Sequence, residues 1–281
     1  MDARQGYAVV RDGDRWIVCE HPARAIVARG ADIFAALSEI GADGFWVGFV
    51  AYDAGRAIER IDPRIDDDLG LPDLAFVRFD SVRVVQELPE GFGADAGDLH
   101  LGAGASSLTP GEHARLVGCV HDLLAAGECY QVNLTRRLMF EAAPEPTALF
   151  GALTRLNPAP HAAMCDFGDA LPGVAVVSAS PELFLRVDGR AVETRPIKGT
   201  AADATTLRTS EKDRAENLMI VDLARNDLGR VCEYGSIHVP ALFAIETHPG
   251  LAHLVSTVRG RLRADVGLDD LVRATFPPAS V

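Results

Sequence analysis

Four strand-length apolar runs follow one another between residues 162 and 194, with little between them except turn residues. The last two runs, residues 183–187 and 190–194, are separated by Asp188-Gly189, a dipeptide that favours tight hairpins. Strands joined this closely pair antiparallel, because a parallel pair needs a crossover connection of a dozen or more residues. The middle of the chain is therefore predicted to form an antiparallel sheet.

Further strands are predicted on both sides of this region, and the helices between them are few. Residues 7–28 alternate and turn at Asp12-Gly13-Asp14, which predicts a hairpin. The other predicted strands cover residues 45–52, 75–86, 129–134, 236–243 and 252–263, and the predicted helices cover residues 31–40, 110–126, 146–156 and 211–228 and a last segment from Gly267. Antiparallel strands with isolated helices predict an α+β fold.

A helix start at residues 109–112 helps to divide the chain. Thr109-Pro110-Gly111-Glu112 combines an N-cap threonine, a proline at the first helical position and a glutamate at the third. Just before it, residues 91–107 are rich in Gly, Ala and Asp, which is typical of a linker. We therefore predict an N-terminal subdomain over residues 1–105 and a second domain over residues 106–281.

Composition excludes several classes of function. The 281 residues carry a net charge of −13, which argues against binding to nucleic acids or to anionic membranes. The five cysteines are widely spaced and form no CxxC pair, so they predict reduced thiols in a cytoplasmic protein. The sequence contains no apolar run of membrane-spanning length and no secretory signal pattern.

A lysine and a glutamate are candidates for chemistry. The chain has only two lysines, and Lys198 lies between a proline and a glycine in Arg195-Pro196-Ile197-Lys198-Gly199-Thr200. The predicted hairpin brings Lys198 close to Glu182. A deprotonated lysine is a nucleophile, and Glu182 is a possible general acid. The alternative is a structural Glu–Lys salt bridge, which the spacing alone favours.

The predicted helix over residues 211–228 carries a candidate metal ligand. At about 100° per residue, Glu216, Ile220, Leu223 and Asp227 fall on one stripe, so Glu216 is expected on a face that is otherwise buried at its centre. A buried carboxylate needs an arginine, backbone donors or a cation as partner, and Mg²⁺ accepts such ligands. The alternative is an acidic residue that only stabilises the start of the helix.

His253 is the third candidate, because it interrupts the apolar strand-like run Ala252-His253-Leu254-Val255-Ser256. A histidine in such a run is more often a hydrogen-bonded core residue than a functional group. The histidines fit no zinc motif, and the sequence contains no glycine-rich phosphate-binding loop.

Six segments together resemble the chorismate-utilising enzymes, over roughly residues 40–281. They are residues 46–53 (WVGFVAYD), 127–134 (GECYQVNL), 180–182 (SPE), 195–200 (RPIKGT), 213–227 and 253–256 (HLVS). The resemblance implies two stacked antiparallel sheets flanked by helices. A lysine at position 198 marks the aminodeoxychorismate branch, whereas anthranilate synthases have alanine there.

By this resemblance, Lys198 attacks C2 of chorismate while Glu182 protonates the departing C4 hydroxyl. Ammonia then enters at C4 and displaces the lysine, which leaves 4-amino-4-deoxychorismate, a precursor of p-aminobenzoate and folate. Glu216 corresponds to one of two family ligands of Mg²⁺, and His253 corresponds to an active-site histidine. The implied cofactor is Mg²⁺, and the implied partners are chorismate and a glutamine amidotransferase subunit that supplies ammonia.

The resemblance also implies that this chain is truncated. In the family, a run like Phe276 to Val281 leads into a Thr-Gly-Ala-Pro-Lys segment that holds a substrate carboxylate. The second metal-binding glutamate lies beyond it, so the site of this chain is expected to lack one wall and one ligand. Two alternatives stay open: another chorismate-transforming enzyme, such as an anthranilate synthase, or a non-catalytic fragment that only docks the amidotransferase.

Overall fold

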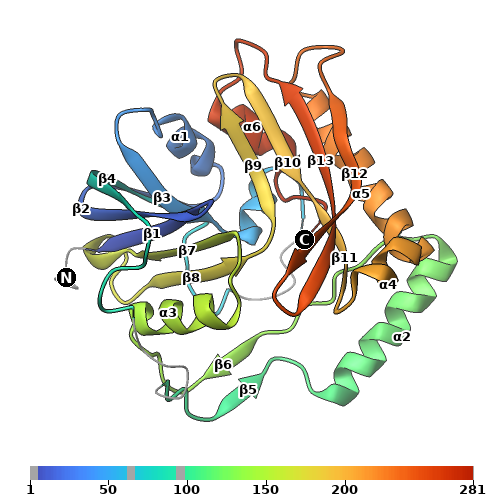
Figure 1. The fold of residues 1–281 in the computed structure, drawn as a ribbon, viewed down its shortest axis with the longest axis horizontal. Helices are drawn as coiled ribbons and strands as arrows, with labels where there is room; N and C mark the ends of the chain where they lie inside the picture. Colours follow the sequence, from blue (N-terminus) through green and yellow to red (C-terminus); the bar gives the residue numbers. More distant parts are fainter. Residues whose placement is uncertain (1–5, 62–66, 93–98, 281) are drawn as a thin grey trace.

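The computed structural model describes residues 6–61, 67–92 and 99–280 of the chain. Two large antiparallel sheets lie side by side, and most of the helices pack against them (Figure 1). The predicted α+β fold is thus confirmed. None of the helices in the described ranges is long and apolar enough to cross a membrane.

The first sheet has six strands in the order β3-β4-β2-β1-β7-β8. Alternate residues of its strands fill two different cores. Val9 and Met164 contribute to one core, whereas Ala8 and Cys165, their neighbours in sequence, contribute to the other. The sheet is therefore covered on both faces. Its strands are β1 (Tyr7–Asp12), β2 (Arg15–Ala28), β3 (Phe45–Val50), β4 (Leu74–Val85), β7 (His161–Asp166) and β8 (Ala175–Ser180).

This sheet takes strands from both sides of the boundary predicted at residue 105. β7 pairs with β1 even though some 150 residues separate them along the chain. The sheet itself is therefore not divided at residue 105, and the division into two domains stays a prediction. Residues 93–98 of the predicted linker lie outside the described residues, and its end forms the short strand β5 (Gly104–Ser106), which pairs with β6 (Leu138–Phe140).

The second sheet is built around one long central strand, β13 (Leu251–Arg261). β12 (His238–His248) pairs with one edge of β13. β10 (Ala191–Arg195) and β11 (Ile197–Ala201) follow one another along the other edge, and β9 (Leu183–Asp188) pairs with β10. The predicted hairpin at Asp188-Gly189 is the turn between β9 and β10.

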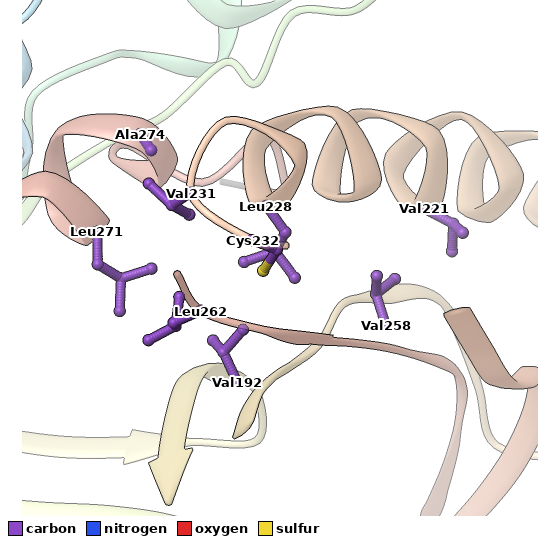
Figure 2. Packing of buried hydrophobic residues seen from close by; sticks show 9 residues of the cluster. All are labelled: Val192, Val221, Leu228, Val231, Cys232, Val258, Leu262, Leu271 and Ala274. Carbon is purple, nitrogen blue, oxygen red and sulfur yellow. The ribbon is translucent and has the colours of Figure 1, made fainter. Parts of the chain in front are cut away.

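A long helix covers the second sheet. α5 (Glu211–Gly229) begins at the N-cap Ser210, whose side chain accepts a hydrogen bond from the backbone N–H of Asp213 at 3.2 Å. Val221 and Leu228 of α5 pack on Val258 of β13, and Leu271 of α6 closes the end of this core (Figure 2). The remaining helices are α1 (Asp32–Ser38), α2 (Pro110–Ala126), α3 (Pro146–Leu156), α4 (Ala204–Thr209) and α6 (Leu268–Thr275), with 3₁₀ helices at Tyr52–Ala57 and Gly168–Ala170.

Local sequence signals located most elements correctly, and one predicted strand is wrong. The helix start at Thr109 is a complete capping box, and Gly127 ends α2 in the left-handed region with φ 76°. The strand predicted over residues 129–134 is wrong: these residues form no strand, and Tyr130 is 91% exposed. A strand needs a neighbour to receive its hydrogen bonds, and no described strand pairs with this segment.

Candidate active site

Lys198 lies in β11 at an irregularity in the pairing with β13. Ile197 is paired with Val255 and Thr200 with His253, so Lys198 and Gly199 together face the single residue Leu254. This two-against-one arrangement is a β-bulge, a device that re-aims a side chain and is common beside active sites. Gly199 has φ +88°, in the region that favours glycine. The backbone conformation of the bulge therefore explains why a glycine follows Lys198.

Gly199 also allows the start of α5 to approach the bulge. A Cβ added to Gly199 would lie 2.9 Å from the Cβ of Asp213 and 3.3 Å from a methyl carbon of Leu207. Real Cβ atoms essentially never come within 3.0 Å of a heavy atom outside their own residue and its two chain neighbours. The residue after Lys198 is therefore held in close contact with the first turn of α5.

Glu182 reaches the same strand from the turn between β8 and β9. Its Oε1 accepts a hydrogen bond from the backbone N–H of Ile197 at 3.2 Å, beside Lys198. The hydroxyl of Ser180 accepts from the N–H of Glu182 at 3.2 Å and fixes the turn. The hairpin thus brings Glu182 next to the lysine-bearing strand, as the spacing predicted.

The two side chains do not form the salt bridge that was the alternative interpretation. Lys198 Nζ donates to the backbone carbonyl of Ser280 at 2.9 Å, and no ion pair of Lys198 occurs among the described residues. The half-buried amine is therefore held by a neutral acceptor from a distant part of the chain, and the Glu182 carboxylate is engaged by a backbone amide.

Glu216 lies on α5, three residues after Asp213 and therefore about one turn further along the same helix. Its side chain is 41% exposed and forms an i, i+4 ion pair with Lys212 at 3.7 Å. The stripe expected around it is only partly buried: Ile220 is 2% exposed, but Leu223 is 42% exposed. The centre of this face is therefore buried at Ile220 but not at Leu223, so the expectation is confirmed only in part.

Glu216 offers Mg²⁺ a single carboxylate ligand. Within the described ranges, no group of three or more His, Cys, Asp or Glu side chains gathers to hold a metal ion. Mg²⁺, however, usually takes one or two carboxylates and completes its shell with substrate oxygens and water. An accessible single carboxylate at this position is compatible with such an ion.

His253 is buried, with 7% of its surface exposed, and is paired with Thr200. Its Nδ1 is hydrogen-bonded to the Thr200 hydroxyl at 2.9 Å, and its ring centroid lies 5.4 Å from that of His248. Burial, and then the neighbouring His248, lower the pKa of His253. His253 is thus a hydrogen-bonded strand residue that directly precedes Leu254, the residue that faces the Lys198 bulge.

The lowered pKa of His253 predicts a loss of stability in mild acid. The unfolded chain binds a proton near pH 6.5, whereas folded His253 resists it, so the free energy of unfolding falls as pH drops below about 6.5. The slope is at most about 1.4 kcal/mol per pH unit for one histidine. Denaturant unfolding between pH 7.5 and 5.5 should show a smaller slope for His253→Gln than for the unchanged chain.

The matched control is His121→Gln, on the exposed surface of α2. This variant should retain the full pH dependence. If His253→Gln and the unchanged chain lose stability with the same slope, His253 does not resist protonation in the folded state.

Two hollows border this region and meet at α5. One lies beside the neighbours of Lys198 and is lined by residues of β9 and β10, by α5 and by the C-terminal segment, including Thr194, Pro196, Ile220, Asp227 and Ser280. Burial raises the pKa of Asp227, and Arg230 partly offsets this effect. The other hollow is a wider groove between α5 and residues 130–133, with Tyr52 at its side. The 129–134 segment therefore lines a groove rather than a sheet.

The structure brings some predicted residues together and leaves others apart. Glu182, Lys198 and His253 all contact β11 or belong to it, and the first turn of α5 touches Gly199. Within the described part of the chain, no hydrogen bond or ion pair joins the side chains of Lys198, Glu216 and His253 to one another.

Sequence reasoning missed Asn217 and Ser256, which are both fully buried at 0% exposure. Their side chains bond to each other, and Asn217 also donates to the carbonyl of Leu254, the residue that faces the bulge. The available signals were an asparagine in line with the buried Ile220 and Val221 on α5, and a hydroxyl in the apolar run of β13.

Comparisons with known proteins identify the family of the chain. Residues 10–281 match the model of a family described as chorismate binding enzyme. The chain is 50% identical over 171 residues to the aminodeoxychorismate synthase of Streptomyces pristinaespiralis, which covers 57% of this chain and 23% of that protein. It is 36% identical over 265 residues to aminodeoxychorismate synthase component 1 of Klebsiella aerogenes, which covers 84% of this chain and 58% of that protein.

The fold has a solved counterpart. The crystal structure of anthranilate synthase component I from Streptococcus pneumoniae superposes with a TM-score of 0.78 at 25% identity, over 94% of this chain and 72% of that one. The matched part of this chain spans 58% of the length of the Klebsiella aerogenes relative and 23% of the length of the Streptomyces pristinaespiralis relative. With a family model that matches nearly all of its residues, this chain belongs to the chorismate binding enzymes.

Proposed function

We propose that the protein carrying this chain converts chorismate and ammonia to 4-amino-4-deoxychorismate. The observation that carries the proposal is the position of Lys198: a half-buried amine in a bulge, next to a strand residue held by the Glu182 carboxylate. The name aminodeoxychorismate synthase, which both relatives carry at 36% and 50% identity, supports the same branch.

In the proposed reaction, Lys198 acts as nucleophile after it has lost a proton. Its Nζ forms a bond to C2 of chorismate, the ring double bonds shift, and the C4 hydroxyl leaves as water with a proton from Glu182. Ammonia then forms a bond to C4, the double bonds shift back, and the C2–N bond to Lys198 breaks. The sum is chorismate plus ammonia giving 4-amino-4-deoxychorismate plus water, and the lysine is regenerated.

The remaining residues are assigned supporting roles. Glu216 would hold a Mg²⁺ ion, which supplies positive charge for a substrate carboxylate when it is bound. His253, with its lowered pKa, would present a neutral imidazole near pH 7. We further propose that ammonia comes from a separate glutamine amidotransferase, in the synthesis of p-aminobenzoate and folate. The words "component 1" in a relative's name support a second component.

The test supplies chorismate, Mg²⁺ and an ammonium salt to the whole gene product that carries this chain. The expected product is 4-amino-4-deoxychorismate, identified by mass and by retention against anthranilate. Formation of anthranilate alone would overturn the branch assignment, and a complete lack of chorismate conversion in this assay would overturn the proposed activity.

A second candidate function is the synthesis of anthranilate. The observation that favours it is the TM-score of 0.78 with anthranilate synthase component I, at 25% identity. A lysine at position 198 argues against it, since that branch has alanine there. A third possibility is a fragment that only docks an amidotransferase. Sequencing the gene beyond Val281 and the same assay would distinguish it from an active enzyme.

The variant Glu182→Gln should separate the role of Glu182 as a general acid from its structural role. The amide oxygen of glutamine can still accept the hydrogen bond from Ile197 N–H, so the strand should stay in place. The proton for the leaving hydroxyl is lost, and the rate of amination should fall by about 10²–10⁴-fold. Steady-state product formation and thermal unfolding, measured side by side, check both statements. Full activity of the Glu182→Gln enzyme would contradict the assignment of Glu182 as the general acid.

A further inference from the structure

A buried polar pair joins α5 to the central strand of the second sheet. Asn217 and Ser256 are both 0% exposed. Ser256 Oγ donates to Asn217 Oδ1 at 2.5 Å and accepts from the backbone N–H of Phe243 at 3.0 Å. Asn217 Nδ2 donates to the carbonyl of Leu254 at 3.2 Å. The hydroxyl is thus used both as donor and as acceptor, and the asparagine both accepts and donates.

This pair lies directly behind the Lys198 bulge. Leu254, whose carbonyl receives the Asn217 amide, is the residue that faces Lys198 and Gly199. The backbone N–H of Ser256 donates to the carbonyl of Pro196 at 3.1 Å. The pair therefore holds β13 at Leu254, where its pairing with β11 is irregular, and at Ser256, two residues further along the strand.

The same pair fixes how α5 sits on the sheet. α5 packs on both β11 and β13 (Figure 1). Asn217 follows Asp213, the residue in contact with Gly199, by one helical turn, and it is the direct neighbour of Glu216. Bonds from Asn217 to Leu254 and Ser256 thus set the relative position of the lysine bulge and the carboxylate of Glu216.

Stability alone does not require polar groups at this place. Replacing both partners of a buried hydrogen bond by apolar groups of the same shape is nearly neutral, and apolar residues fill the rest of this core. A fully satisfied buried network does, however, impose one geometry, because a shifted helix would leave donors and acceptors unpaired.

We infer that Asn217 and Ser256 are positioning residues, which hold the Lys198 bulge and the Glu216 helix in register for the chemical step. The inference rests on the proposed function for its kinetic consequence. Misplacing a reacting group by about 1 Å costs up to about 100-fold in rate. Ser256→Ala should therefore lower the turnover number by roughly 10- to 100-fold, with the KM for chorismate changed less than about twofold.

The experiment compares Ser256→Ala, Ser256→Thr and Thr154→Val in the whole gene product. Ser256→Thr keeps the hydroxyl and should restore most of the turnover. Thr154 is the matched control, because it is a buried hydroxyl that bonds to the Phe150 carbonyl at 2.9 Å in α3, away from the bulge. Thr154→Val should lower the melting temperature without a specific loss in turnover. If Ser256→Ala is folded and turns over as fast as the unchanged enzyme, the inference is wrong.

A second measurement needs no activity. The chain has only Lys198 and Lys212, so amine labelling of the two can be followed in separate peptides. Ser256→Ala should speed amide hydrogen exchange in residues 196–201 and change the labelling rate of Lys198 relative to Lys212. Exchange in β1 to β4 should stay the same. A failure of the proposed function appears as an inactive unchanged enzyme, whereas unchanged exchange and labelling at β11 overturn the positioning role.

Discussion

Replacing Lys198 by alanine is expected to abolish a covalent intermediate between the enzyme and chorismate. With ammonia left out, the unchanged protein should accumulate an adduct on Lys198 with the mass of chorismate less one water. Lys198→Ala offers no amine at the bulge, so the adduct should disappear and the amination rate should fall by at least about 100-fold. Acid quenching followed by mass spectrometry of the peptide that contains residue 198 measures both states.

The chain offers a matched control for this experiment, because Lys212 is its only other lysine. Lys212 lies on the exposed side of α5, and Lys212→Ala should keep the adduct on Lys198. Retention of the adduct mass in Lys198→Ala, or its appearance on the peptide that contains Lys212, would refute the role of Lys198 as nucleophile. Thermal unfolding of both variants shows whether either change disturbs the fold.

Gly199→Ala is expected to have the largest effect on stability. The new Cβ would lie 2.9 Å from the Cβ of Asp213, and residue 199 has φ +88°. Backbone strain of about 1–3 kcal/mol and overpacking of about 1–3 kcal/mol together predict a loss of roughly 2–6 kcal/mol in the free energy of unfolding. Relief of the clash would push α5 away from the Lys198 bulge, so activity should fall even where the protein stays folded.

The variant Gly189→Ala separates the effect of backbone strain on stability from the effect of a steric clash. Gly189 turns the hairpin between β9 and β10 with φ +57°, but its added Cβ would meet nothing within 4 Å. Only the strain of about 1–2 kcal/mol remains, and activity per folded molecule should be unchanged. Denaturant unfolding of the two variants gives the comparison. Equal losses would mean that the contact between Gly199 and α5 is unimportant for stability.

Local sequence signals were sufficient to predict the elements that are stabilised by residues close to one another in the sequence. The capping box at Thr109 and the hairpin at Asp188-Gly189 both depend on residues within a few positions of one another. The segment at residues 129–134 shows the limit of this reasoning. Its apolar pattern is typical of a strand, but a strand forms only where a partner accepts its hydrogen bonds.

The candidate site was predictable in part for the same reason. The hairpin was enough to bring Glu182 next to the Lys198 strand, and the structure confirms that proximity through Ile197. The bond from Lys198 to Ser280 joins residues 82 positions apart, so no local pattern indicated it. The salt bridge that spacing favoured did not form, because both side chains are occupied by backbone groups.

By itself, the sequence determined the antiparallel α+β architecture and the identity of the chemically capable residues, since periodicity and turn chemistry act over short distances along the chain. Only the tertiary structure decided how those residues are presented. The Lys198 bulge depends on a one-residue offset against β13, on the contact of Gly199 with Asp213, and on the buried pair of Asn217 and Ser256. Each of these joins segments that meet only after the two sheets and α5 have packed, because register and close contact are properties of two surfaces together.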